Sequence, residues 1–440
     1  MRQRTSLLVT EMKNSCRPFS PLDLTYLGGR GKEALESLQQ TRERARLAEK
    51  MVTKIVDLRS DTVTKPTEAM RAAAASAIVD DDVLGSDPTA SLFEAEIAAL
   101  VGKEAACFVP SGTMANLICV LVHCEVRGSE VILGDKCHIN VYENGGISTI
   151  GGVHSRTVPN NPDGTMDLDL IEAAIRDPHE ELYYPTTRLI CLENTHANSG
   201  GRCISLEYTD KVGEIAKRHA LKLHIDGARI FNASVALGVP VDRLVQAADS
   251  VSVCLSKGLG APVGSVILGS KSFIVKAKRL RKTLGGAMRQ VGILCAAARV
   301  ALNDNVSKLA EDHRKAKILA EGLSRIKGLK VNSASVETNI VKSPHPPGLS
   351  SFHAVFFEIL ESSNISVEKF CNFLKEHGIL VMAVDTCSRY ELLLRTLAIA
   401  LVFGVCQCIR VVLHHQISES DIHYTLSCIQ LLFPQYLVGN

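Results

Sequence analysis

Apolar and polar positions alternate in blocks from about residue 55 onward. Six short apolar runs, rich in valine, isoleucine, leucine and cysteine, have the length and composition of buried strands. The runs are ACFVP (106–110), EVILG (130–134), RLICLEN (188–194), LKLHID (221–226), SVSVCL (250–255) and GSVILG (264–269). Amphipathic stretches such as 113–128 and 206–220 separate most of them and predict helices. Because strands that are apolar throughout are buried on both faces, the pattern predicts an α/β fold with a mostly parallel sheet flanked by helices.

The pattern changes after about residue 305. A charged helical stretch (306–328) leads into the strand-like runs NIVKS and AVFFEIL and a further helical stretch, VEKFCNFLKEHG. We therefore predict a large domain over residues 54–305 and a smaller C-terminal α+β domain over residues 306–440. Residues 1–53 predict a polar leader that is disordered or partly helical. An organellar transit peptide is the alternative, although the acidic residues of this leader argue against it.

Composition and charge limit the class of protein. Apolar residues make up 46% of the chain and charged residues 22%, as in soluble globular proteins. A net charge of +2 offers no electrostatic footprint for nucleic acid or for a membrane, so we expect neither as a partner. The 14 cysteines include no C-x-x-C pair, and several lie within apolar runs, where free cysteine packs as a small hydrophobic residue. We expect a cytoplasmic protein without a metal site, with the mitochondrion as the alternative compartment.

Polar residues follow two of the predicted strands, where ligands bind in parallel α/β sheets. Ser111, Gly112 and Thr113 lie between a strand and a helix, and amides at a helix start suit a phosphate group. A simple helix cap is the alternative. Asp226 ends another apolar run, and a buried carboxylate needs a cationic partner. Arg229, three residues further on, would supply that partner in a purely structural interpretation.

Lys257 lies between the apolar run that ends at Leu255 and the small residues GLGAPVGS. Burial disfavours the charged form of lysine and favours a neutral amine, which can form a Schiff base with a carbonyl. A phosphate-binding turn, a strand-end carboxylate and such a lysine are together what pyridoxal 5'-phosphate requires. The carboxylate would keep the ring nitrogen protonated, so that the ring accepts electrons. The sequence therefore predicts a pyridoxal phosphate enzyme.

Seven segments, in order along residues 55–290, resemble the low-specificity L-threonine aldolases, which are fold-type I pyridoxal phosphate enzymes. The segments are VDLRSDTVTKPTEAM, FVPSGTMANL, GDKCHINVYENGG, CLENTHANSGG, LHIDGARIFNA, CLSKGLGAPVGS and LRKTLGGAMRQ. The resemblance implies that Lys257 forms the internal aldimine and that Asp226 faces the pyridine nitrogen. It also implies that the turn Ser111, Gly112 and Thr113 binds the cofactor phosphate.

The same resemblance assigns five further residues. His138 corresponds to a histidine that stacks on the cofactor ring, although without the resemblance a histidine after an apolar strand is more often structural. His196, in the ENTH segment, corresponds to a histidine that reaches the active site. Ser60 and Arg229 correspond to residues that hold the substrate carboxylate, with Arg410 as a second arginine from the small domain.

Two segments depart from the family pattern. The family loop reads approximately DDVYG, whereas this chain has DDVLG, with Leu84 in place of a tyrosine that lines the site near a subunit interface. The stretch from Thr386 to Cys408 has no counterpart in the family. It directly precedes Arg410, so it bears on where that arginine lies.

The resemblance implies retro-aldol cleavage of L-threonine and L-allo-threonine to glycine and acetaldehyde. It also implies a homo-oligomer, a dimer of dimers. Another fold-type I reaction is an alternative: β-elimination, hydroxymethyl transfer or racemisation. A non-catalytic homologue that binds pyridoxal phosphate is a further one. His138, His196 or a water held by a histidine would be the base, and the sequence leaves that choice open.

Overall fold

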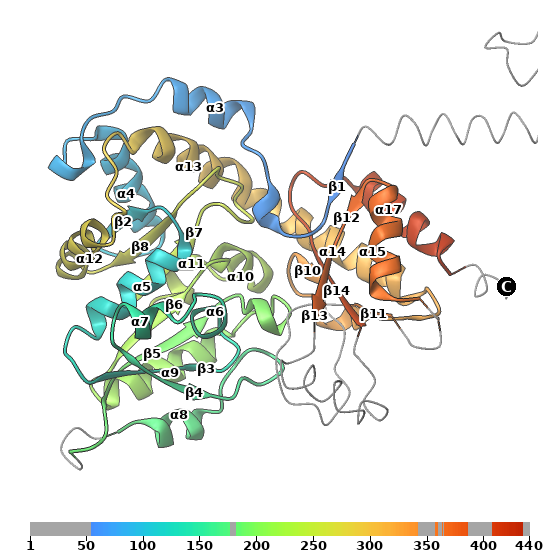
Figure 1. Ribbon diagram of the computed structural model, residues 1–440. Helices are drawn as coiled ribbons and strands as arrows, with labels where there is room; N and C mark the ends of the chain where they lie inside the picture. The colour runs from blue at the N-terminus through green and yellow to red at the C-terminus, as the bar shows by residue number, and fades with distance from the viewer. Residues whose placement is uncertain are drawn as a thin grey trace, which may run out of the picture. The chain divides into compact units, whose positions relative to one another are not determined.

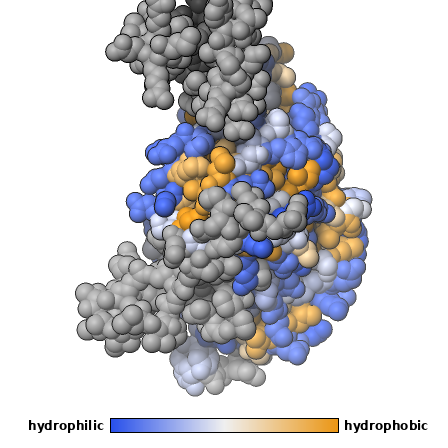
Figure 2. All heavy atoms as spheres, turned by 90° about the vertical axis from the view of Figure 1, so that its right-hand side faces the viewer, coloured by the Kyte–Doolittle hydropathy of each residue, from blue (hydrophilic) through white to orange (hydrophobic). Residues whose placement is uncertain are grey.

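The computed structural model describes residues 54–176, 182–341, 357–359, 363, 365–385 and 407–433. The predicted leader, residues 1–53, therefore lies outside the described residues, and so does most of the stretch from Thr386 to Cys408. All features below belong to the unit Val56–Asn440. None of the helices within these ranges is long and apolar enough to cross a membrane. On the face in Figure 2, apolar side chains lie in patches among hydrophilic ones.

A seven-stranded sheet confirms the predicted α/β class (Figure 1). In order across the sheet the strands are β2 (Ala105–Val109), β8 (Ser265–Gly269), β7 (Ser250–Cys254), β6 (Lys222–Asp226), β5 (Thr186–Glu193), β3 (Ser129–Gly134) and β4 (His154–Val158). Five strands, β3 to β7, run parallel, and β8 is antiparallel to both of its neighbours. Each of the six predicted runs overlaps one strand. The pattern missed β4, whose residues HSRTV are mostly polar, because this strand lies at the edge of the sheet.

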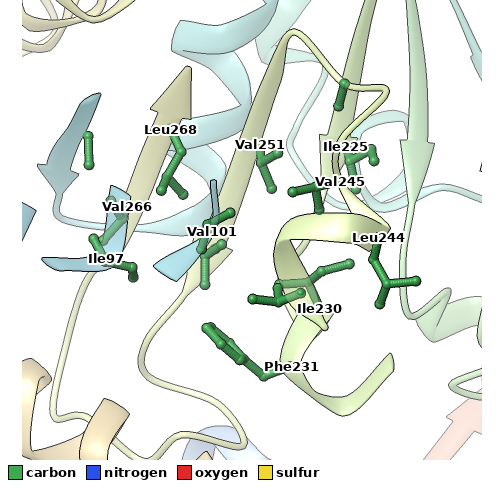
Figure 3. Packing of buried hydrophobic residues seen from close by; sticks show 14 of the residues in the cluster. Ile97, Val101, Ile225, Ile230, Phe231, Leu244, Val245, Val251, Val266 and Leu268 are labelled. Carbon is green, nitrogen blue, oxygen red and sulfur yellow. The ribbon is translucent and has the colours of Figure 1, made fainter. Parts of the chain in front are cut away.

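Successive residues of the central strands are buried on opposite faces, which explains their unbroken apolar sequences. Ile132 and Ile190 belong to one cluster of buried side chains, whereas Val131 and Leu189 belong to another. The first cluster includes residues of α4 (Pro88–Leu100), α9 (Leu206–Arg218), α10 (Ile230–Leu237), α11 (Val241–Leu244) and α13 (Gly292–Asn305). Figure 3 shows part of it. The opposite face packs against α5 (Gly112–His123), α7 (Gly146–Thr149) and α12 (Lys271–Thr283).

A second sheet lies C-terminal to these helices in the sequence. Its strands are β9 (Leu329–Lys330), β10 (Ile340–Val341), β11 (Phe357–Ile359), β13 (Met382–Asp385) and β14 (Gln407–Val412). Buried side chains of most of these strands form one hydrophobic cluster with three helices, α14 (Leu309–Ser324), α15 (Val367–Glu376) and α17 (Glu419–Leu431). This order of helices and strands agrees with the α+β pattern, while the domain boundary at residue 305 stays a prediction.

The segment before the large sheet is bound to this second region. Strand β1 (Val56–Asp57) pairs in parallel with β12 (Ile379–Leu380). The amide of Val412 donates to the carbonyl of Leu58 at 2.9 Å, and the amide of Lys65 donates to the side chain of Gln416 at 3.0 Å. Residues between these contacts, among them Ser60 and Asp61, are thereby held against β14. This contact brings the start of the described chain next to its end.

Two histidines lie buried between α5 and the sheet. His224 of β6 and His123 at the end of α5 are both hydrogen-bonded to the hydroxyl of Ser250, at 2.9 and 2.8 Å. Burial lowers the pKa of His224 to about 4. Burial, together with repulsion from His224, lowers the pKa of His123 to about 3. Both rings are therefore neutral in the folded protein near neutral pH.

We predict that the protein loses stability as the pH falls from about 6.5 towards about 4. Over this range the unfolded chain binds protons at histidines, with a pKa near 6.5, that the folded chain excludes. His313 and His415, whose pKa burial lowers to about 4, add to this slope, whereas Asp312, whose pKa burial raises to about 6, opposes it. In His123→Phe, the free energy of unfolding that is lost between about pH 7.5 and about pH 5 should be smaller by about 2 kcal/mol.

The measurement is the free energy of unfolding in denaturant at about pH 7.5 and about pH 5. His423→Gln is the matched control, because the side chain of His423 is 63% exposed. An unchanged slope in H123F would contradict the assignment of a neutral buried imidazole.

Candidate active site

A cavity of about 310 Å3 opens at one edge of the large sheet. Strands β2, β6 and β7 end there, because β2 and β7 are both antiparallel to β8 and therefore run the same way. The predicted site residues that line the cavity are Ser111, Gly112, Thr113, His138, Asp226 and Lys257. All residues predicted to bind the cofactor thus meet at one place. The volume lies at the lower end of the range for small-molecule sites.

The start of α5 forms one wall of this cavity. The hydroxyl of Ser111 accepts a hydrogen bond from the amide of Met114 at 3.2 Å, so Ser111 caps the helix. The amides of Gly112 and Thr113 belong to the first helical turn, which provides no carbonyl partner for them. A Cβ at Gly112 would lie 2.6 Å from the sulfur of Cys254, so only glycine allows this close approach to β7. The turn therefore combines a helix cap with free anion-binding amides.

Asp226 lies at the end of β6 with only 3% of its surface exposed. Its Oδ1 accepts from the amide of Ala228 at 3.1 Å, and its Oδ2 accepts from the side chain of Asn116 at 2.9 Å. Both donors are neutral. The structural interpretation that pairs Asp226 with Arg229 is wrong, because Arg229 binds a different carboxylate.

That carboxylate is Asp61, and the pair is bidentate and buried. Arg229 Nε donates to Asp61 Oδ2 at 2.7 Å, and Nη2 donates to Oδ1 at 2.6 Å. Asn339 also donates to Asp61 Oδ2, at 3.3 Å. Burial alone would raise the pKa of Asp61, but Arg229 and the charges of Lys257 and Arg410 hold it well below its usual value. Three cationic side chains thus act on one carboxylate.

Arg410 lies in β14, opposite Met382 of β13. Its Nε is buried and has no hydrogen-bond partner among the described residues. Burial and the repulsion of Arg229 lower the pKa of Arg410, and Asp61 and Tyr142 offset this only in part. Lys257 is half-buried beside the cavity, so it is less shielded from water than its apolar flank suggests.

His138 starts the short helix α6 (His138–Val141) and is hydrogen-bonded through Nδ1 to Glu143 Oε1 at 2.8 Å. Burial alone would lower the pKa of His138, but this bond and the charges of Asp226 and Glu193 outweigh burial and raise it. Burial raises the pKa of Glu143, and its hydrogen bonds offset this only in part. One ring nitrogen of His138 and one carboxylate oxygen each of Glu143 and Asp226 lie within 4.8 Å of one another.

Glu193, at the end of β5, positions both histidine-bearing segments. Its Oε2 accepts from the amide of His138 at 2.7 Å, and its Oε1 accepts from the amide of Ala197 at 2.8 Å. His196 caps the turn Ala197–Ser199, where its Nδ1 accepts from the amide of Ser199 at 3.1 Å. His196 is 1% exposed and does not line the cavity.

Four predicted residues lie outside the cavity lining: Ser60, Arg229, Arg410 and His196. Ser60 caps the turn Asp61–Val63, where its hydroxyl accepts from the amide of Thr62 at 3.2 Å. Arg229 and Arg410 connect to the site through Asp61. Leu84, the departure in the DDVLG loop, is 77% exposed and lies away from the cavity lining.

The sequence interpretation missed Asp61, Asn116, Glu143 and Glu193. Each lies within a segment that resembles the family. Glu193 is the last residue of strand β5, whereas the other three do not lie at the end of a strand. Their partners are distant in the sequence, so residue spacing gave no indication of the contacts. A charged or amide side chain inside an otherwise apolar stretch, as at Asn116 in α5, was the available indication.

Comparison with known proteins identifies the family of the chain. Residues 57–344 match the family model described as beta-eliminating lyase. Low-specificity L-threonine aldolase 1 of Arabidopsis thaliana is 64% identical over 380 residues, which cover 86% of this chain and 97% of that protein. Low specificity L-threonine aldolase of Escherichia coli O157:H7 is 46% identical over 269 residues, covering 61% of this chain and 79% of that protein.

A solved structure shows the same fold. The threonine aldolase of Leishmania major superposes with a TM-score of 0.67 at 20% identity, covering 86% of this chain and 99% of that chain. The expected fold is thereby confirmed, and the sequence matches confirm the resemblance found from the seven segments. The chain belongs to the low-specificity L-threonine aldolases, within the beta-eliminating lyase family.

Proposed function

We propose that this protein binds pyridoxal 5'-phosphate in the 310 Å3 cavity and cleaves L-threonine and L-allo-threonine to glycine and acetaldehyde. The observation that supports it most is the convergence of an amine, a carboxylate and a helix start on one cavity. The names of the similar proteins support the same activity. When bound, the cofactor supplies an aldehyde for amino groups and a ring that accepts the electron pair of a breaking bond.

The residues present fit this cofactor. The free amides of Gly112 and Thr113, at the start of a 12-residue helix, suit its phosphate. Asp226 accepts hydrogen bonds from two neutral donors at the cavity, and its carboxylate suits a protonated ring nitrogen. Lys257, which lines the cavity, would supply the amine that holds the cofactor aldehyde.

The cationic part of the site would hold the substrate carboxylate. Asp61 neutralises one of the two positive charges of Arg229 and Arg410, which leaves a net charge suited to a single carboxylate. Arg410 Nε, which has no hydrogen-bond partner among the described residues, would donate to that carboxylate. The hydroxyl of Ser60, 3.5 Å from Asp61 Oδ1, would be a second donor. A fixed carboxylate would limit rotation about the bond from nitrogen to Cα of the substrate, so these residues would orient the Cα–Cβ bond for cleavage.

The hydrogen bonds favour His138 over His196 as the base for the β-hydroxyl. Glu143 accepts the proton of His138 Nδ1, so the neutral ring keeps a free lone pair on Nε2. In His196 the amide of Ser199 donates to Nδ1, so the neutral ring has its proton on Nε2 and is a donor there. His138 also lines the cavity. We assign His196 to holding the turn that follows it.

Assembly and location stay predictions. A homotetramer built as a dimer of dimers is implied by the resemblance, and a cytoplasmic location is inferred from the free, buried cysteines.

Changing Lys257→Ala should abolish both turnover and the visible absorbance of the bound cofactor, a loss on the order of 10³-fold or more in rate. The assay measures glycine and acetaldehyde formed from L-allo-threonine. Lys276→Ala, which removes an exposed lysine paired with Glu125, should retain full activity. An undiminished rate in K257A would refute the assignment. A 2-oxo acid with ammonia would instead indicate elimination, and cofactor binding without products would indicate a non-catalytic homologue.

Changing Arg410→Ala should raise KM for L-threonine about tenfold to a hundredfold, because a charge-assisted hydrogen bond to the carboxylate is lost. The absorbance of the bound cofactor should be unchanged. Arg299→Ala removes an exposed arginine that pairs with Glu96 and serves as the control. Equal KM values in both variants would exclude Arg410 from carboxylate binding.

Changing His138→Asn should lower kcat by about 10² or more and leave KM nearly unchanged. Asparagine retains a donor towards Glu143 but has no atom in the place of Nε2. In His196→Asn the Oδ1 takes the place of Nδ1 and can still accept from Ser199, so kcat should fall much less. A larger loss in H196N than in H138N would reverse the two assignments.

A further inference from the structure

Asn116 lies in the second turn of α5, where it lines the cavity and is 2% exposed. Its Nδ2 donates to Glu143 Oε1 at 2.8 Å and to Asp226 Oδ2 at 2.9 Å. One amide nitrogen therefore uses both of its protons on two different carboxylates. The first of these serves His138, and the second faces the cavity beside Lys257.

The orientation of this amide is fixed by its other side. Asn116 Oδ1 accepts from the hydroxyl of Ser252 at 2.7 Å and lies 3.2 Å from His224 Nε2. An amide oxygen only accepts, so His224 carries its proton on Nε2. If the amide were flipped, its nitrogen would face the donors Ser252 and His224. Its oxygen would then face the carboxylates of Glu143 and Asp226.

The same logic extends away from the site. Since neutral His224 has its proton on Nε2, its Nδ1 accepts from the hydroxyl of Ser250. The oxygen of Ser250 then accepts from His123 Nε2 at 2.8 Å. All these hydrogen bonds point one way, from His123 through Ser250 and His224 to Asn116 and on to the carboxylates. A chain with a single direction resists reversal at any one member.

We propose that Asn116 is a positioning residue of the reaction, which holds Asp226 towards the cofactor ring and Glu143 towards His138. This inference rests on the proposed function, because the roles of Asp226 and His138 belong to it. Oxygen atoms of the two carboxylates lie within 4.8 Å of each other, and burial and the charge of Asp226 both raise the pKa of Glu143. Asn116 opposes the repulsion between the two by donating one N–H group to each carboxylate.

Several other titratable groups face the two carboxylates. Around Asp226 and Glu143 lie His138 from α6, Glu193 from β5, Lys257 from the turn after β7 and His224 from β6. The thiols of Cys119, Cys137 and Cys191 lie nearby, but burial raises the pKa of each well above neutral, so they remain uncharged. These thiols therefore do not contribute to a pH titration of the site near neutral pH.

The test is Asn116→Asp, which keeps the shape and replaces the donor nitrogen by a carboxylate oxygen. Cofactor-free protein is titrated with pyridoxal 5'-phosphate, and the dissociation constant is obtained from the change in absorbance. The dissociation constant should rise about tenfold or more. The pH midpoint of the bound cofactor's visible absorbance should move upward by about one unit, because added negative charge favours protonated forms.

Asn160→Asp is the matched control. Asn160 is also buried, and its side chain makes two hydrogen bonds to the backbone, to the amide of Lys136 and the carbonyl of Gly164, away from the cavity. N160D should lower stability without moving either readout. If N116D binds the cofactor as N160D does and keeps the wild-type pH midpoint, the inference is overturned.

A second pair of variants tests the same point without changing Asn116. His224→Leu removes the donor that locks the amide, and should move the pH midpoint in the same direction as N116D. His224→Gln restores an N–H group where Nε2 lies and should return the midpoint to the wild-type value. Identical midpoints in both variants and the wild type would overturn the inference. Wild-type protein that shows no cofactor absorbance at all would instead refute the proposed function.

Discussion

The buried ion pair between Asp61 and Arg229 is the interaction on which the architecture of the site depends. Asp61 is 0% exposed and Arg229 is 6% exposed, so neither charge could remain there alone. The pair joins the segment after β1 to the segment after β6, and Asn339 adds the region of β10 to the same carboxylate. Removing either partner would leave an uncompensated charge inside the protein. One contact thus holds together three parts of the chain that are remote in sequence.

Strand direction explains why the chemistry gathers where it does. Strands β2, β3, β6 and β7 run the same way, so the residues after each of them emerge at one edge of the sheet. Asp226, Lys257, His138 and the turn at Ser111 all take their positions from this rule. The antiparallel strand β8 does not change this arrangement. Its two neighbours, β2 and β7, are both antiparallel to it and therefore run in the same direction as each other. Side chains that no local motif relates are therefore brought to one cavity by topology alone.

The same rule separates what could be predicted from what could not. The unbroken apolar runs predicted six strands, and the residues after them predicted the cavity lining. The polar edge strand β4 was missed because four of its five residues are exposed or only partly buried, unlike those of the apolar edge strand β2. Partners within the site were missed because Arg229 and Asp61 are 168 residues apart, and Asp226 and Asn116 are 110 apart. Spacing along the chain cannot indicate such contacts, and so Asp226 was given the wrong alternative partner.

The charges of the site are divided between two regions, and this division bears on the proposed reaction. Arg229, Arg410 and Lys257 act on Asp61, whereas Asp226, Glu143 and Glu193 surround His138. An amino acid presents one carboxylate, which the first region attracts and the second repels. Its orientation would therefore be set before any bond breaks, and the β-hydroxyl would lie towards the acidic region. There a histidine whose pKa is raised by those carboxylates is a stronger base than one in water, so the electrostatics that orient the substrate also favour the removal of its proton.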